Sequence, residues 1–174
     1  LNSFILGEFY QTHAYEKAVK CLRDAIIMGT GILKVYEDYD GRVGVDRVLP
    51  TDIYFDDNDS LNGDPQQMIQ LKLMDRDKLM ANSPADKRGL IAATPQSYPD
   101  NSPDSGRTTA DQVMAVEGWK LPSGPDPKAP GYIPGRHTIA TVAGVIIDEK
   151  WHKCKFPFVF LKYSDPFTGF FGQG

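Results

Sequence analysis

Residues 9–28 carry the clearest hydrophobic periodicity in the chain. Their apolar positions recur at the 3.6-residue period of an α-helix, and charged residues lie mainly on the other side. Gly29 and Gly31 follow, and glycine accepts the left-handed conformation with which helices often end. The pattern predicts one long amphipathic helix with these apolar positions: Tyr15, Ala18, Val19, Leu22, Ala25, Ile26 and Ile27.

A tight β-hairpin is predicted directly after this helix. Residues 32–37 are largely β-branched or aromatic, which is typical of a strand. Asp40-Gly41 is a strong turn signal, because both residues tolerate positive φ. Residues 42–49 are the predicted return strand, which Pro50 ends, and residues 53–55 are a third short strand.

The middle of the chain is predicted to mix a strand with short helices. Ile69, Leu71 and Leu73 alternate with Gln70, Lys72 and Met74, which indicates a strand with one face in water. Asp75 can cap a short helix that runs to about Ala81. A second short helix is predicted over residues 84–93, with Pro84 in its first turn.

Two segments of the second half are predicted to be mobile surface loops. Residues 94–110 are poor in hydrophobic residues and rich in Pro, Ser, Asp and Thr, and residues 122–134 contain five prolines. Neither segment can bury enough apolar surface to offset the entropy of ordering it. Strands are predicted between and after them, at residues 113–121, 136–142, 145–148 and 158–163, with a hairpin turn at Ala143-Gly144.

These elements together predict an α+β fold class. Strands do not alternate regularly with helices and the hairpins are tight, so the sheet is expected to be antiparallel. We expect a single domain over residues 1–174 with an antiparallel β-rich body, either a small barrel or a bent sheet. One long N-terminal amphipathic helix and one or two short helices accompany it.

The charge balance bears on possible partners. The chain has 19 basic and 23 acidic side chains, so 19 − 23 gives a net charge of −4. A protein that grips nucleic acid needs a strong basic excess, which is lacking here. No apolar run approaches the roughly 20 residues of a membrane-spanning helix.

No residue pattern predicts a catalytic residue, a cofactor site or a metal site. Asp52, Asp56, Asp57, Asp59 and Asp64 offer oxygen ligands, but counting from Asp56 a calcium-binding loop would need Gly at residue 61 and Glu at residue 67. Those positions hold Leu61 and Gln67. A solvated acidic turn is favoured. Cys21 and Cys154 fit no zinc or redox spacing, so two free thiols are favoured over a disulfide.

Aromatic residues crowd the end of the chain. Two explanations stay open for them: they belong to a hydrophobic core, or they anchor a contact between subunits, where aromatic side chains are enriched. The candidate subunit-interface residues are Tyr163, Phe167, Phe170 and Phe171. The abrupt apolar sequence at both ends also leads us to expect that the chain is a piece of a larger protein.

The order of these features resembles the portal, or head-to-tail connector, proteins of tailed bacteriophages and prophages. The resemblance covers about residues 15–60 and 111–174. It rests on the helix that leads into residues 24–35, on the Asp40-Gly41 hairpin, and on the segment from Val48 to Asp56, which contains the Pro-Thr-Asp-Ile turn. It continues with Val116-Glu117-Gly118-Trp119, the hairpin of residues 135–139, and Phe156-Pro157-Phe158-Val159 leading to Gly169-Phe170-Phe171-Gly172.

The resemblance implies the outer wing of a portal subunit, often built around a small SH3-like barrel. Such subunits form a ring, typically a dodecamer, at one capsid vertex, and DNA passes through its channel during packaging and ejection. The implied partners are other portal subunits, the terminase, capsid proteins and tail or adaptor proteins. The implied location is the virion, with the host cytoplasm during assembly. The channel-lining helices of the family are absent from this sequence, so this piece is not expected to grip DNA. The implied role is structural and needs no cofactor.

Two other functions are weighed against this one. A carbohydrate- or small-ligand-binding β module could use Trp119, Trp151 and Tyr163 as stacking platforms. A metal-dependent nuclease, the less favoured alternative, could use Asp52, Asp56 and Asp57 as ligands.

Overall fold

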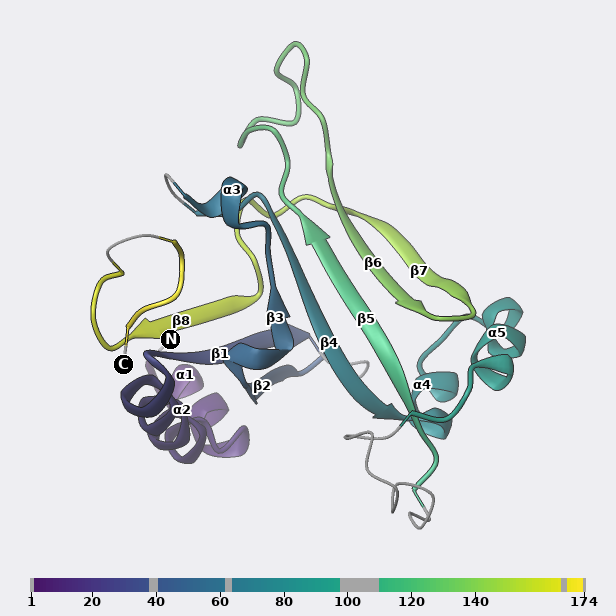
Figure 1. The fold of residues 1–174 in the computed structure, drawn as a ribbon, viewed down its shortest axis with the longest axis horizontal. Coiled ribbons are helices and arrows are strands. Elements are labelled where there is room, and N and C mark those ends of the chain that lie inside the picture. Colours follow the sequence, from purple (N-terminus) through teal and green to yellow (C-terminus); the bar gives the residue numbers. More distant parts are fainter. Residues whose placement is uncertain (1, 38–40, 62–63, 98–109, 167–168, 174) are drawn as a thin grey trace. The chain divides into compact units, whose positions relative to one another are not determined.

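The chain has the α+β, antiparallel β-rich fold that its sequence predicts (Figure 1). The computed structural model describes residues 2–37, 41–61, 64–97, 110–166 and 169–173. The chain divides into two compact units, and the single domain expected from the sequence stays a prediction. The first unit comprises residues 1–66 and 155–174, and the second comprises residues 67–154.

The helical part of the first unit differs from the prediction. Instead of one helix over residues 9–28 there are two, α1 (Asn2–Gln11) and α2 (Ala14–Met28). His13 between them has φ 52°, in the left-handed region. A right-handed helix cannot continue through a residue in that conformation. The hydroxyl of Thr12 donates to the carbonyl oxygen of Glu8 at 2.7 Å, which satisfies an acceptor at the end of α1.

A three-stranded antiparallel sheet packs beside α2. Its strands are β1 (Thr30–Glu37), β2 (Val43–Val48) and β8 (Phe158–Lys162), in the order β2-β1-β8. Gly29 ends α2 with φ 80°, as the sequence predicts. Of the predicted Asp40-Gly41 turn, Gly41 has φ 71°, and Asp40 lies outside the described residues.

Short elements follow this hairpin in the first unit. They are the 3₁₀ turn η1 (Pro50–Asp52), β3 (Ile53–Tyr54) and α3 (Asp57–Ser60). The acidic segment predicted as a loop thus contains one helical turn. Asp56 caps that turn by accepting a hydrogen bond from the backbone N–H of Asn58 at 2.8 Å.

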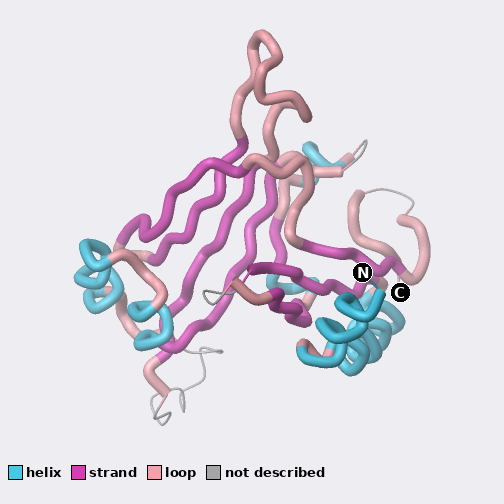
Figure 2. Tube along the Cα trace, turned by 180° about the vertical axis from the view of Figure 1, so that it is seen from behind, coloured by secondary structure: helices cyan, strands magenta, loops and turns pink. Residues whose placement is uncertain are grey.

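The second unit contributes four neighbouring antiparallel strands. They run in the order β4 (Gln67–Asp75), β5 (Gln112–Lys120), β6 (Gly135–Thr141) and β7 (Gly144–Trp151). Short helices α4 (Arg76–Ala81) and α5 (Arg88–Ala93), with the 3₁₀ turn η2 (Ala85–Lys87), lie at one end of these strands (Figure 2). The hydrophobic core at that end contains Leu79, Ile91, Val113 and Ile146.

Two expectations about the strands are corrected. In β4 the buried residues are Met68 and Gln70, whereas Ile69 is exposed, so the strand presents the opposite face from the one its alternation predicted. No barrel closes among the described strands, because β2 and β8 each pair along β1 and β7 pairs only with β6. Closure requires the outer strands to pair with each other.

Hydrogen bonds join the ends of both proline-rich segments to the neighbouring chain. The hydroxyl of Ser97 accepts a hydrogen bond from the backbone of Met114 at 3.2 Å, and the Ser97 N–H donates to Gln112 at 2.7 Å. Ser123 and Ile133 close the second segment in the same way, at 3.0 and 2.8 Å. Residues 98–109 lie outside the described residues, and the mobility of both segments stays a prediction.

Candidate subunit interface

An apolar stripe runs along the exposed side of α2 in the first unit. Tyr15, Val19, Leu22 and Ile26 are spaced by four, three and four residues, which places them on one side of the helix. This is also the spacing of a coiled-coil seam. All four side chains are exposed, from 49 % for Leu22 to 68 % for Val19. We call these four residues the α2 stripe.

The opposite side of α2 packs on the sheet, although an amphipathic helix ordinarily buries its more apolar side. Cys21, Asp24 and Ala25 are buried there. A Cβ added at Gly31 would lie 2.0 Å from the Cys21 carbonyl oxygen, so the missing side chain lets α2 approach β1 closely. The chain thus buries the side of α2 with the smaller side chains, including one carboxylate, and leaves the α2 stripe in water.

An ion pair helps to fix this orientation. Arg47 of β2 donates from Nε and Nη2 to the two carboxylate oxygens of Asp24, at 2.5 and 2.6 Å. The Asp24 side chain is 5 % exposed, so the bidentate contact with Arg47 replaces the hydrogen bonds that water would otherwise make to it. Burial and the nearby Asp24 carboxylate raise the pKa of the Cys21 thiol, which keeps it neutral at this contact.

Further apolar residues of the first unit extend the exposed surface. None of the residues of α1 is buried, and its Phe4, Leu6 and Tyr10 are exposed. Phe9 of α1 meets Tyr15 of α2 edge to face, with ring centroids 5.7 Å apart. The exposed Phe9 of α1 therefore lies directly beside the α2 stripe.

The sheet adds two residues on the same side as α2. Leu161 pairs with Gly31 and Val159 pairs with Leu33, so both lie on the face of the sheet that meets Cys21. Both are nevertheless exposed. The helix α2 therefore leaves the β8 side of this face uncovered.

Charges of both signs border the α2 stripe. Glu16, Lys20 and Arg23 are exposed on α2, and Glu16 lies 3.6 Å from the ring of His13. A mixed polar rim around an apolar centre is typical of protein–protein interfaces. A surface for nucleic acid would instead be mainly basic.

The aromatic residues proposed from sequence divide into two groups. Phe170 is only 7 % exposed and packs on Phe160 and Phe55, with ring centroids 4.8 and 5.3 Å apart. Phe171 is half-buried against Phe55 at 4.9 Å. Their packing favours the core explanation over the interface explanation. Tyr163 is 62 % exposed and stays a candidate contact, and Phe167 lies outside the described residues.

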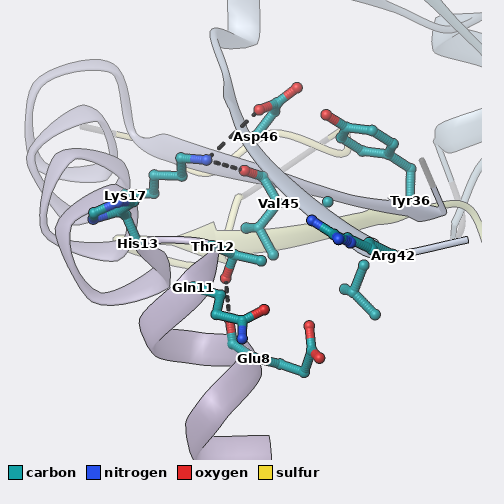
Figure 3. A pocket seen from close by; sticks show the side chains of 11 residues that line it. Glu8, Gln11, Thr12, His13, Lys17, Tyr36, Arg42, Val45 and Asp46 are labelled. Carbon is teal, nitrogen blue, oxygen red and sulfur yellow. Dashed lines mark hydrogen bonds and ion pairs between the residues drawn. The ribbon is translucent and has the colours of Figure 1, made fainter. Parts of the chain in front are cut away.

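A hollow of about 260 Å³ lies between the α1–α2 junction and the β1–β2 hairpin (Figure 3). Lys17 crosses its edge, donating from Nζ to the Val45 carbonyl oxygen at 2.5 Å, with Asp46 Oδ1 3.8 Å away. Arg42 and Glu8 also line it. Because it combines charges of both signs, the hollow favours no single class of ligand.

Several residues named for the alternative functions already have partners in the structure, and Trp119 and Trp151 both contact His137. Asp56 is occupied as a helix cap, and Asp59 accepts from the Gln66 N–H at 2.5 Å. No group of three or more His, Cys, Asp or Glu residues among those described could hold a metal ion. Trp119 is buried and stacked on His137, so it offers no open face to a sugar. Cys21 and Cys154 are both free, as predicted.

Comparisons with known proteins add no identification. No protein-family model matches the chain, and no curated protein sequence matches it significantly. Among the described helices, none is both long and apolar enough to cross a membrane.

Proposed function

We propose that the chain is a structural, non-catalytic part of a phage portal subunit, the wing region of a ring through which DNA is packaged and ejected. The observation that carries this proposal is the outward α2 stripe. The sequence resemblance to portal proteins supplies the family, and the stripe supplies a physical reason for assembly.

Covering the α2 stripe would lower the free energy of the protein relative to leaving it in water. Full burial of one large apolar side chain contributes about 1.5–3 kcal/mol, so completing the burial of four half-exposed ones contributes roughly 3–6 kcal/mol before the losses on association. Soluble monomers rarely leave such a contiguous patch in water. A ring multiplies this modest contact, because every subunit repeats it and the ring closes.

The occupant that we propose for this surface is a neighbouring copy of the same subunit. The rim carries Glu16 together with Lys20 and Arg23, so a second copy can offer opposite charges to each. Polyanionic DNA would be repelled by Glu16 and by the net charge of −4. Such a ring would guide DNA without gripping it, at the virion vertex where terminase, capsid and tail proteins meet.

Electron microscopy of the full reading frame tests this function. The proposal expects closed rings for the wild type, and it fails if no ring forms at any protein concentration. Val19→Lys introduces a charge into the α2 stripe and is expected to disrupt ring formation. Val142→Lys is the matched control, because Val142 is 71 % exposed, close to the 68 % of Val19, and lies in the β6–β7 turn. Intact rings with Val19→Lys would remove the α2 stripe from the contact.

A further inference from the structure

A histidine in the second unit lies between two carboxylates from the neighbouring strands. His137 of β6 places Nδ1 2.7 Å from Oε1 of Glu149 on β7. Its Nε2 lies 3.0 Å from Oε1 of Glu117 on β5. One imidazole thus bridges three strands. The His137 side chain is 12 % exposed, that of Glu117 18 %, and that of Glu149 59 %.

Both contacts can be hydrogen bonds to ionised carboxylates only when both ring nitrogens carry a proton. A neutral imidazole has one donor nitrogen and one acceptor nitrogen, and ionised carboxylates only accept. In the neutral form one nitrogen lone pair would therefore face a carboxylate oxygen without a proton between them. The geometry therefore fits an imidazolium between two ionised carboxylates.

Two tryptophans also favour the charged form. Trp119 stacks on His137 with centroids 5.4 Å apart and planes 21° apart, and Trp151 lies at 5.8 Å and 52°. The face of an indole ring attracts a cation. Burial of His137 opposes its charge, but the hydrogen bonds to Glu117 and Glu149 together with the negative charges of these carboxylates raise the pKa of His137 above its ordinary value.

The charged groups that act on His137 come from both flanking strands. Glu117 projects from β5 and Glu149 from β7. The next strand, β4, pairs Met68 with Trp119 and Gln70 with Glu117, so its nearest residues on this face are uncharged. Lys153, which follows β7, lies over Trp151 with its Nζ 5.2 Å from the ring centroid.

We propose that Glu117, His137 and Glu149 form a pH-sensitive latch that holds strand β7 to β6 and β5. Among the described strands β7 pairs only with β6, and the register of that pairing is interrupted by a bulge between Ile139 and Ala140. A bulge weakens the backbone ladder locally. The His137–Glu149 contact therefore adds a side-chain interaction between β6 and β7 on the other side of the bulge from the hairpin turn.

Deprotonation would release β7 before β5. The mostly exposed Glu149 can turn into water, whereas the more buried Glu117 has less access to it. Because the pKa of His137 is raised on folding, the stabilisation is complete below the ordinary histidine pKa of about 6.5 and is lost as pH rises through the folded-state pKa. The strand β7 should thus be firmly held in mild acid and looser in mild alkali.

Intrinsic fluorescence can report on the latch directly. The chain has two tryptophans, Trp119 and Trp151, and both contact His137. Between about pH 5 and about pH 9, on either side of the ordinary histidine pKa, wild-type emission should change in a single one-proton step. The midpoint of that step should lie above the ordinary value. His137→Gln should abolish the step, and Glu149→Gln should lower its midpoint.

Arg136→Gln is the matched control. Arg136 pairs with Asp148 on the other face of the same two strands, at 2.6 and 2.5 Å. Its replacement should therefore leave the fluorescence step unchanged. Hydrogen exchange gives the second readout: after correction for intrinsic rates, the protection of β7 amides should fall about tenfold or more across the step, as expected for a lost hydrogen bond to a charged group. A midpoint at or below the ordinary value, or β7 protection that does not change with pH, would overturn the proposal. Because Glu149→Gln keeps the shape of the side chain, it decides the matter if His137→Gln fails to fold.

Discussion

Removing either partner of the Asp24–Arg47 ion pair should have unequal consequences. The Asp24 side chain is 5 % exposed and that of Arg47 is 38 % exposed. Arg47→Met leaves a carboxylate buried without its partner. Asp24→Asn leaves a guanidinium that water can still reach, together with an amide oxygen that can accept one of its hydrogen bonds. Arg47→Met should therefore lower the stability of the first unit strongly, and Asp24→Asn only mildly.

The magnitudes follow from burial. An uncompensated buried charge costs about 3–5 kcal/mol, and partial access of water at Arg47 favours the lower end, about 3 kcal/mol for Arg47→Met. Loss of one charge-assisted hydrogen bond that water can partly replace gives about 1 kcal/mol for Asp24→Asn. The double variant has no buried charge, so it should lose about 1–2 kcal/mol, less than Arg47→Met alone.

Hydrogen exchange under native conditions measures these differences in the unit where they arise. Protection of the α2 and β1 amides gives the free energy of opening there, while the tryptophan signal reports on residues 67–154 and should not change. The reasoning is refuted if Asp24→Asn destabilises α2 as much as Arg47→Met does. It is also refuted if the double variant is less stable than Arg47→Met.

Three further predictions concern packing and reactivity. Gly31→Ala should destabilise the α2–β1 contact by about 1–3 kcal/mol or more, because its Cβ would meet the Cys21 carbonyl oxygen at 2.0 Å; loss of α2 protection in hydrogen exchange checks this. Phe170→Ala should cost about 3–5 kcal/mol and Tyr163→Ala less than about 0.5 kcal/mol, since only the first ring is buried; equal effects in urea unfolding would contradict the core assignment. A thiol reagent should modify exposed Cys154 quickly and Cys21 only on unfolding, because Cys21 is buried and burial raises its pKa; rapid modification of two thiols in the native protein would contradict the buried contact.

Local signals predicted the elements well. Gly29 ends α2 because glycine readily adopts the left-handed conformation found there. Asp75 caps α4 by accepting a hydrogen bond from the Lys78 N–H at 3.1 Å. The β6–β7 turn was predicted to within one residue: it lies at Val142-Ala143 instead of Ala143-Gly144, and Gly144 begins β7. Each of these features depends on a few neighbouring residues, so one sequence contains enough information to find it.

Features set by distant residues were not predictable in this way. The periodicity of α2 shows an apolar side, but the side that is buried depends on Gly31 and Arg47, which follow in other elements. The pattern also missed the left-handed His13, because nothing in the helical period marks that residue. The His137 bridge joins residues of three strands, and these residues meet only because of the register in which the strands pair. The spacing of Tyr15, Val19, Leu22 and Ile26 was the available signal for the exposed stripe.

The molar mass of the full reading frame in solution, measured by light scattering over a range of concentrations, tests the central claim about the α2 stripe most directly. A lysine in place of Val19 loses apolar burial and adds a charge at the contact, at a cost of about 2–3 kcal/mol, which corresponds to roughly 30- to 150-fold weaker association at each contact. The account predicts a ring-sized mass for the wild type and for Val142→Lys, and a much smaller mass for Val19→Lys at the same concentration. Equal masses for Val19→Lys and the wild type, or a wild type that stays monomeric throughout, would contradict it.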